Sequence, residues 1–120
     1  MMETLIEKSL SSDEQAYDEL IEKSLSGDEH AYAELIELVK PDLYKVARTK
    51  LRSLDDIDDA FQETILKSYK NLNQLNNRKS FKSWIVTIFK NECNNINYKY
   101  NRNTKIFNKV VDTLDSEESI

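Results

Sequence analysis

The sequence has only one glycine, Gly27, and one proline, Pro41, among its 120 residues. Sheets and hairpins depend on turn residues of these kinds, so their scarcity argues against strands. Charged residues make up 32% of the chain and apolar residues 39%, which is too apolar for full disorder. The composition therefore favours one all-α domain, a compact bundle of about four main helices joined by short polar loops.

Cysteine and histidine are equally scarce, with only Cys93 and His30. A single cysteine excludes an internal disulfide and a cysteine-based zinc site, and we expect Cys93 to be half-buried and inert and His30 to lie on the surface. No nucleophile–base pair, phosphate loop or metal set stands out, so we predict no enzyme activity, no catalytic residue, no cofactor and no metal. No apolar run approaches the roughly 18 residues of a membrane span and no export signal opens the sequence, which favours a cytoplasmic protein.

Acidic and basic residues are segregated along the chain. Residues 1–66 carry 17 acidic and 7 basic side chains. Residues 67–109 carry 1 acidic and 10 basic side chains, and residues 110–120 carry 4 acidic side chains and no basic one. The net charge of −5 hides this asymmetry, which predicts separate surfaces for separate partners. The basic segment also holds seven of the eleven aromatic residues, a composition typical of proteins that bind single-stranded or melted nucleic acid.

Residues 5–19 and 20–34 form an internal repeat, identical at twelve of fifteen positions. Solenoid repeats are longer and need about three copies to bury a core, so we interpret the repeat as a tandem duplication. Each copy contains an S-x-x-E capping box that predicts a helix start, Ser11 to Glu14 and Ser26 to Glu29.

Apolar residues at helical spacing then predict the main helices. One helix runs from Ala31 to Leu51 with a kink or break at Pro41, and its stripe includes Leu38. The next begins near Asp55, and its stripe includes Leu66. After a polar loop over 73–79, Ser80 is the expected N-cap of a helix that ends at about Asn101. A short amphipathic piece and a frayed acidic end follow over 104–120.

The helix predicted from Ser80 is a candidate nucleic-acid surface. Opposite its apolar stripe lies a flank of amides, hydroxyls and lysine: Ser83, Thr87, Lys90, Asn91, Asn94, Asn97 and Tyr98. Amides can pair with base edges and lysines attract phosphates, although a merely solvated face is the alternative. Trp84 lies on the apolar stripe, where a core position and a base-stacking position are both open. Arg78 and Lys79 precede the helix and could reach phosphates there.

Four carboxylates lie within the five residues from Asp55 to Asp59. The spacing does not match a calcium loop, because no glycine follows and no glutamate stands at the twelfth position. Stabilisation of a helix N-terminus accounts for part of this cluster. The excess of negative charge predicts a basic protein partner.

Four motifs in this order resemble region 2 of the sigma-70 family, and the extracytoplasmic-function subgroup matches best. Its usual patterns, G-D-E-x-A-[FY]-x-x-L, E-D-x-x-Q-E-T-F, S-F-x-x-W-L and I-A-x-N, correspond to residues 27–35, 58–65, 80–85 and 88–91. The resemblance covers about residues 20–102. It implies a region 2 domain over 20–103, preceded by a duplicated helical segment over 1–19 and followed by a short helix with an acidic linker or tail over 104–120.

The resemblance also implies roles for individual residues. Asp58, Asp59, Gln62 and Glu63 are expected to dock on the β′ clamp helices of bacterial RNA polymerase core. The loop over 73–79 and the helix from Ser80 are expected to recognise the promoter −10 element and help melt it, by capturing bases of the non-template strand. The residues on that DNA-binding surface are Asn77, Arg78, Lys79, Trp84, Lys90, Asn94, Asn97, Tyr98 and Arg102.

The sequence departs from the family at several positions. Asn95 stands where relatives often carry aspartate and Tyr98 where they often carry arginine, so the promoter sequence that is read stays open. No −35-reading helix-turn-helix is recognised, so we expect either a fragment or a region-2-only factor with a separate −35-reading partner. The alternative function is a sigma-like module that binds polymerase or an anti-sigma protein without reading a promoter.

Overall fold

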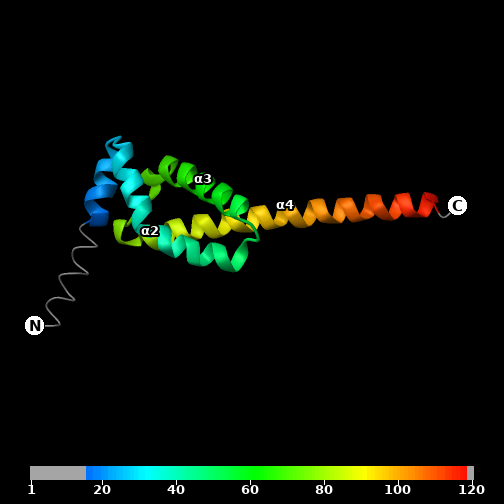
Figure 1. Cartoon of the computed structure of the whole chain (residues 1–120). Coiled ribbons are helices and arrows are strands. Elements are labelled where there is room, and N and C mark those ends of the chain that lie inside the picture. Colours follow the sequence, from blue (N-terminus) through cyan, green and yellow to red (C-terminus); the bar gives the residue numbers. More distant parts are fainter. Residues whose placement is uncertain (1–15, 119–120) are drawn as a thin grey trace, which may run out of the picture.

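Four α-helices and two short 3-10 turns make up residues 16–118, the part of the chain that this computed structural model describes; side chains are described up to Leu114. No strand occurs in this range, so the predicted all-α fold of about four helices is confirmed. The elements are a helix over residues 16–25, α2 (Glu29–Lys50), α3 (Leu54–Lys70), η1 (Leu72–Gln74), η2 (Arg78–Ser80) and α4 (Phe81–Glu118). Figure 1 shows α2 and α3 beside the first half of α4.

The start of α2 differs from the predicted capping box. Asp28, not Ser26, is the N-cap, and its side chain accepts a hydrogen bond from the amide of Ala31 at 3.1 Å. Ser26 instead donates its hydroxyl to the carbonyl of Glu22 at 3.1 Å, which closes the preceding helix. Gly27 ends that helix at φ +100°, a conformation that glycine adopts without strain, and this places Asp28 at the cap. The matching box from Ser11 to Glu14 lies outside the described residues.

Pro41 does not break α2, which continues from Glu29 to Lys50. Figure 1 shows the two halves of α2 running in different directions, in accordance with the predicted kink. Proline removes one backbone donor inside a helix, but Val39 and Leu43 on either side of it are fully buried. Their packing holds the helix together across the missing hydrogen bond.

The 3-10 turn η2, which leads into α4, has Asn77 as its N-cap, and Ser80 lies inside this turn, so the prediction of Ser80 as the N-cap was wrong. The Asn77 side chain accepts a hydrogen bond from the amide of Lys79 at 3.0 Å and starts η2. Ser80 is the last residue of η2, and its carbonyl accepts the hydroxyl of Ser83 at 3.0 Å. Asn77 therefore initiates the turn that leads directly into α4.

The start of the preceding helix, predicted near Asp55, was almost correct, because α3 begins at Leu54 with Ser53 as its N-cap.

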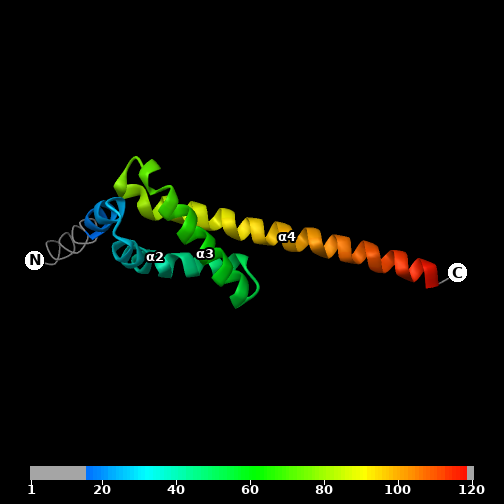
Figure 2. The same cartoon turned by 90° about the horizontal axis from the view of Figure 1, so that it is seen from above.

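Helix α4 is longer than predicted. It does not end near Asn101 but continues to Glu118, and Figure 2 shows its second half projecting away from the other helices. No glycine or proline interrupts residues 81–118, so nothing in the covalent chemistry of the backbone ends the helix there. This projection extends the described structure to 79 Å along its longest axis, against 35 and 22 Å along the others.

The hydrophobic core lies where α2 and α3 pack against the first half of α4. It includes Leu35, Val39 and Leu43 from α2, Ala60 and Phe61 from α3, and Phe81, Ile85 and Phe89 from α4. The ring centroids of Phe61 and Phe89 lie 5.0 Å apart. Those of Tyr17 and Phe81 lie 6.1 Å apart, so the helix over residues 16–25 packs against the start of α4. The bundle thus holds α3 and the beginning of α4 in a fixed relation.

Two predicted stripe residues lie outside this core. Leu38 is 45% exposed and Leu66 is 65% exposed. Leu66 instead lines an open, mainly apolar groove of about 430 Å³ between α2 and α3. Helical spacing indicates which side of a helix a residue occupies, but whether a neighbour covers that side depends on how the helices cross.

Cys93 is fully buried rather than half-buried, and burial raises the pKa of its thiol to about 11. The reactive thiolate is therefore scarce at pH 8, and solvent does not reach it. We predict that Ellman's reagent labels Cys93 in the folded chain at under about 1% of the rate in denaturant, where the pKa returns to about 8.5. Stoichiometric labelling of the folded protein within minutes would contradict this burial.

Candidate functional site

Helix α3 presents an acidic surface made of the predicted docking residues. Asp58, Asp59, Gln62 and Glu63 are all exposed, and their spacing places them on one side of the helix. Within residues 16–118, neither Asp58 nor Asp59 takes part in an ion pair. Carboxylates this close repel one another, so a cationic partner would relieve the repulsion. We call these four residues the acidic face.

The acidic face meets α4 in a groove of about 810 Å³. Asp59, Gln62 and Glu63 line one side of it, while Tyr98 and Arg102 line the other. The sequence assigned these two sets to separate surfaces, but the structure brings them together at one groove. Asp58, Lys90, Asn94 and Asn97 lie outside its lining.

An ion pair between Lys67 and Glu92 lines the same groove and fixes α3 to α4. The Lys67 ammonium donates to the Glu92 carboxylate, and this hydrogen bond raises the pKa of Lys67. Glu92 is only 7% exposed. The only acid among residues 67–109 is therefore neutralised inside the fold, and the outer surface of this segment keeps its positive charge.

A second hollow, of about 340 Å³, lies between the loop and the start of α4. We call it the loop pocket; its lining is Gln74, Leu75, Asn76, Asn77, Ser80, Ser83, Trp84 and Thr87. The lining is rich in amides and hydroxyls, which can donate to and accept from the edge of a base. Trp84 is half-buried, 5.9 Å from the Phe81 ring between centroids, so it packs on the core and also lines this pocket. The core position of Trp84 is confirmed, and its role in base stacking stays a prediction.

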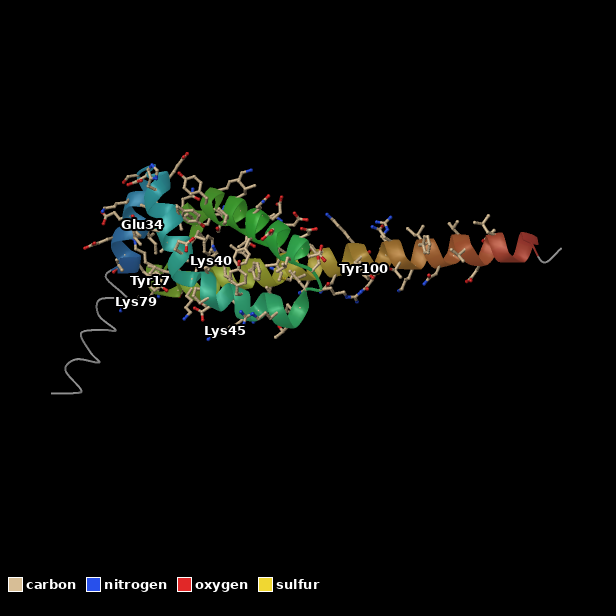
Figure 3. All side chains as sticks on the ribbon, in the orientation of Figure 1. Tyr17, Glu34, Lys40, Lys45, Lys79 and Tyr100 are labelled. Carbon is tan, nitrogen blue, oxygen red and sulfur yellow. The ribbon has the colours of Figure 1, made fainter. Side chains whose placement is uncertain are left out.

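Basic residues surround a third hollow, of about 520 Å³, next to Ser83. Lys79 was predicted as part of the DNA-binding surface, whereas Lys45 and Lys82, which also line this hollow, were not predicted. Figure 3 shows Lys45 and Lys79 projecting from the same edge of the bundle. The Lys82 ammonium lies 3.0 Å from a carboxylate oxygen of Asp42, and Arg78 lies 3.7 Å from Glu22. Lys45 was not predicted as part of a basic surface because it belongs to the first half of the sequence, where acidic residues outnumber basic ones.

Further along α4, Lys90, Asn94, Tyr98 and Arg102 are exposed and Asn97 is half-buried. The flank is not packed into the interior, but two of its amides already have partners. Asn97 donates to the carbonyl of Lys50 at 2.8 Å, and the ammonium of Lys50 donates to Asn94 at 3.3 Å.

The end of α2 and the loop after it therefore contribute two cations that the sequence did not assign to this surface. One is Lys50 itself. The other is Arg52, whose guanidinium carbon lies 4.3 Å from the centre of the Tyr100 ring, a cation–π contact. Lys50 lies 44 residues before Asn94 and Arg52 lies 48 residues before Tyr100 in the sequence, so only the fold could place them beside α4.

The described residues contain no group of three or more side chains arranged to hold a metal ion. None of the helices described combines the length and the apolar character that crossing a membrane requires.

Comparison with known families matches residues 35–102 to one model, Sigma-70 region 2. The matched range spans α2 from Leu35, all of α3, the loop pocket and α4 as far as Arg102. No curated protein and no solved structure matches the chain significantly.

Proposed function

The chain belongs to the sigma-70 family through its region 2 domain, which has a sigma-factor-like role in RNA polymerase binding and promoter recognition, and we propose that it performs both steps through the surfaces described above. In this proposal the acidic face docks on the β′ clamp helices of the polymerase core. The loop pocket and the flank of α4 that carries Lys90, Asn94, Asn97, Tyr98 and Arg102 then read the −10 element and help to melt it. Region 2 is a transcription regulatory module and not a known enzyme family. In this proposal binding energy alone drives these steps.

The loop pocket is the observation that carries the promoter-reading part of this proposal. It is open to solvent, lined mostly by residues that carry an amide or a hydroxyl, and bounded by an indole that packs on the core. An unstacked base that enters it would exchange its stacking in the duplex for contact with Trp84 and hydrogen bonds to the amides. Lys79 lies next to the pocket in η2 and would hold the adjoining phosphate.

Promoter reading is tested by replacing Trp84 and measuring strand binding by the complex of polymerase core with the chain. We expect Trp84→Ala to weaken binding of single-stranded non-template oligonucleotides with randomised −10 bases by about tenfold, because stacking contributes roughly 1–3 kcal/mol per base. Trp84→Phe, which keeps an aromatic surface, should recover most of the loss. Fluorescence anisotropy measures the affinity, and circular dichroism checks that both variants fold.

The two variants also separate the proposal from its alternative. Polymerase binding should be the same for both, because Trp84 lies outside the acidic face. If Trp84→Ala folds and binds polymerase but leaves strand affinity unchanged, the pocket does not read DNA. The protein-interaction module that binds polymerase without reading a promoter would then be the better description.

A further inference from the structure

The second half of α4 carries an apolar stripe that no other part of the described structure covers. Ile106, Phe107, Val110 and Leu114 are between 51% and 66% exposed. Residues 103–118 project beyond the bundle as a single helix about 24 Å long. An isolated helix of this length is marginal in water, since most helical stability in proteins comes from packing of an amphipathic side. A partner helix on this stripe would provide that packing.

The stripe continues the register of the core-facing side of α4. Phe89, Cys93 and Ile96 face α2 and α3, and the same alternation of four and three residues then leads to Tyr100, Asn103, Phe107, Val110 and Leu114. Such an alternation is the heptad pattern of helices that pair along their length. The bundle supplies the partner for the first part of this pattern, and the described residues leave the second part without one.

The charges of this segment indicate what kind of partner fits. Residues 99–109 contain four basic and no acidic residues, and residues 110–120 contain four acidic and no basic residues. The segment is therefore basic toward the bundle and acidic toward its far end. Another copy of the same segment running antiparallel would place each basic half beside the acidic half of its partner. A parallel pair would instead place like charges together, which is unfavourable.

We propose that residues 99–118 of α4 form an antiparallel helix pair with the same segment of a second copy of the chain. The stripe around Phe107 and Val110 lies at the centre of the pair, and the opposite charges lie toward its two ends. The proposal does not depend on the proposed function. A helix pair this short buries little surface area, so we expect a weak dimer with a dissociation constant of roughly 1 μM to 1 mM.

Sedimentation velocity over a wide concentration range tests the association. The wild-type chain should pass from monomer to dimer as its concentration rises, and Phe107→Asp should raise the dissociation constant at least about tenfold. Leu54→Asp is the matched control, because Leu54 is also apolar and is 77% exposed but lies at the start of α3. A wild-type chain that stays monomeric at about 1 mM, or an equal loss in both variants, overturns the proposal.

Disulfide cross-linking tests the orientation. Val110→Cys places a thiol near the centre of the pair, and Asn103→Cys places one on the same stripe, on the order of 15–20 Å from its counterpart in an antiparallel pair. Under mild oxidation the first variant should form dimers at least about ten times faster than the second. The wild-type chain, with Cys93 buried, is the background control. Equal cross-linking of both variants would indicate a parallel pair and contradict the proposal.

Discussion

Replacing Asp58 and Asp59 together by lysine should weaken binding to core RNA polymerase by about a hundredfold or more. Both carboxylates are exposed and take part in no ion pair among the described residues, so the change costs the fold little. If the acidic face docks on a basic surface, each reversal turns an attraction into a repulsion across the interface, and like charges there cost several kcal/mol. A pull-down with core polymerase, followed by anisotropy with labelled chain, measures the loss.

The matched control is the double reversal Glu34→Lys with Glu37→Lys. These two glutamates are exposed on α2 and change the net charge by the same amount, but they lie outside the acidic face. We expect this variant to bind polymerase within about threefold of the wild type, since the control retains the docking residues and alters the long-range field. It also removes the exposed ion pair of Glu37 with Lys40, which contributes little to stability. Equal losses in both variants would show that net charge, not the acidic face, governs binding. Unchanged binding of the Asp58 and Asp59 variant would refute the docking assignment itself.

Much of the fold is predictable because the sequence repeats apolar residues at helical spacing. Phe81, Ile85 and Phe89 recur every four residues, and all three are fully buried. The scarcity of glycine and proline likewise predicts helices and short loops, and within residues 16–118 the structure contains no strand. The exposure of the acidic face is predictable for the same reason, because charged residues opposite an apolar stripe face the solvent.

Helix ends are less predictable, because several residues compete to cap the same backbone amides. Ser26 and Ser80 have the right chemistry for an N-cap, yet Asp28 caps α2 and Asn77 caps the 3-10 turn η2 that leads into α4. Which residue caps depends on where the chain turns, and the left-handed Gly27 decides it for α2. The far end of α4 was missed for a different reason, since its polar composition resembles a linker although nothing in it breaks a helix.

The composition of the candidate site was only partly predictable, because its cations come from distant parts of the sequence. Lys45, Lys50 and Arg52 belong to the acidic first half of the chain but lie against the start of α4 or its middle. The net charge of a segment does not show which of its charged side chains will lie close to another segment in the folded protein. The groove between α3 and α4 was missed likewise, because it depends on how two helices cross.

Phe89→Ala should be the most destabilising single substitution of the core, lowering the free energy of unfolding by about 3–5 kcal/mol. The Phe89 ring is fully buried, and it lies against Phe61, the contact that joins α4 to α3. Domains of this kind are stable by roughly 5–15 kcal/mol, so the variant should lose a large fraction of its stability. Urea denaturation followed by circular dichroism measures the change, with the slope of the transition checking that the variant unfolds in the same way.

Phe107→Ala is the control for this experiment, because it makes the same substitution in the same helix at a position that is 66% exposed. Measured at a concentration where the chain is monomeric, it should change the free energy of unfolding by less than about 0.5 kcal/mol, as surface substitutions usually do. The comparison separates the loss of core packing from any effect of removing an aromatic residue from a helix, since alanine favours helix in both places. A Phe107 variant as unstable as the Phe89 variant would show that the projecting half of α4 packs within the monomer. Because the antiparallel pairing requires that half to be free in the monomer, this result would also count against the dimer.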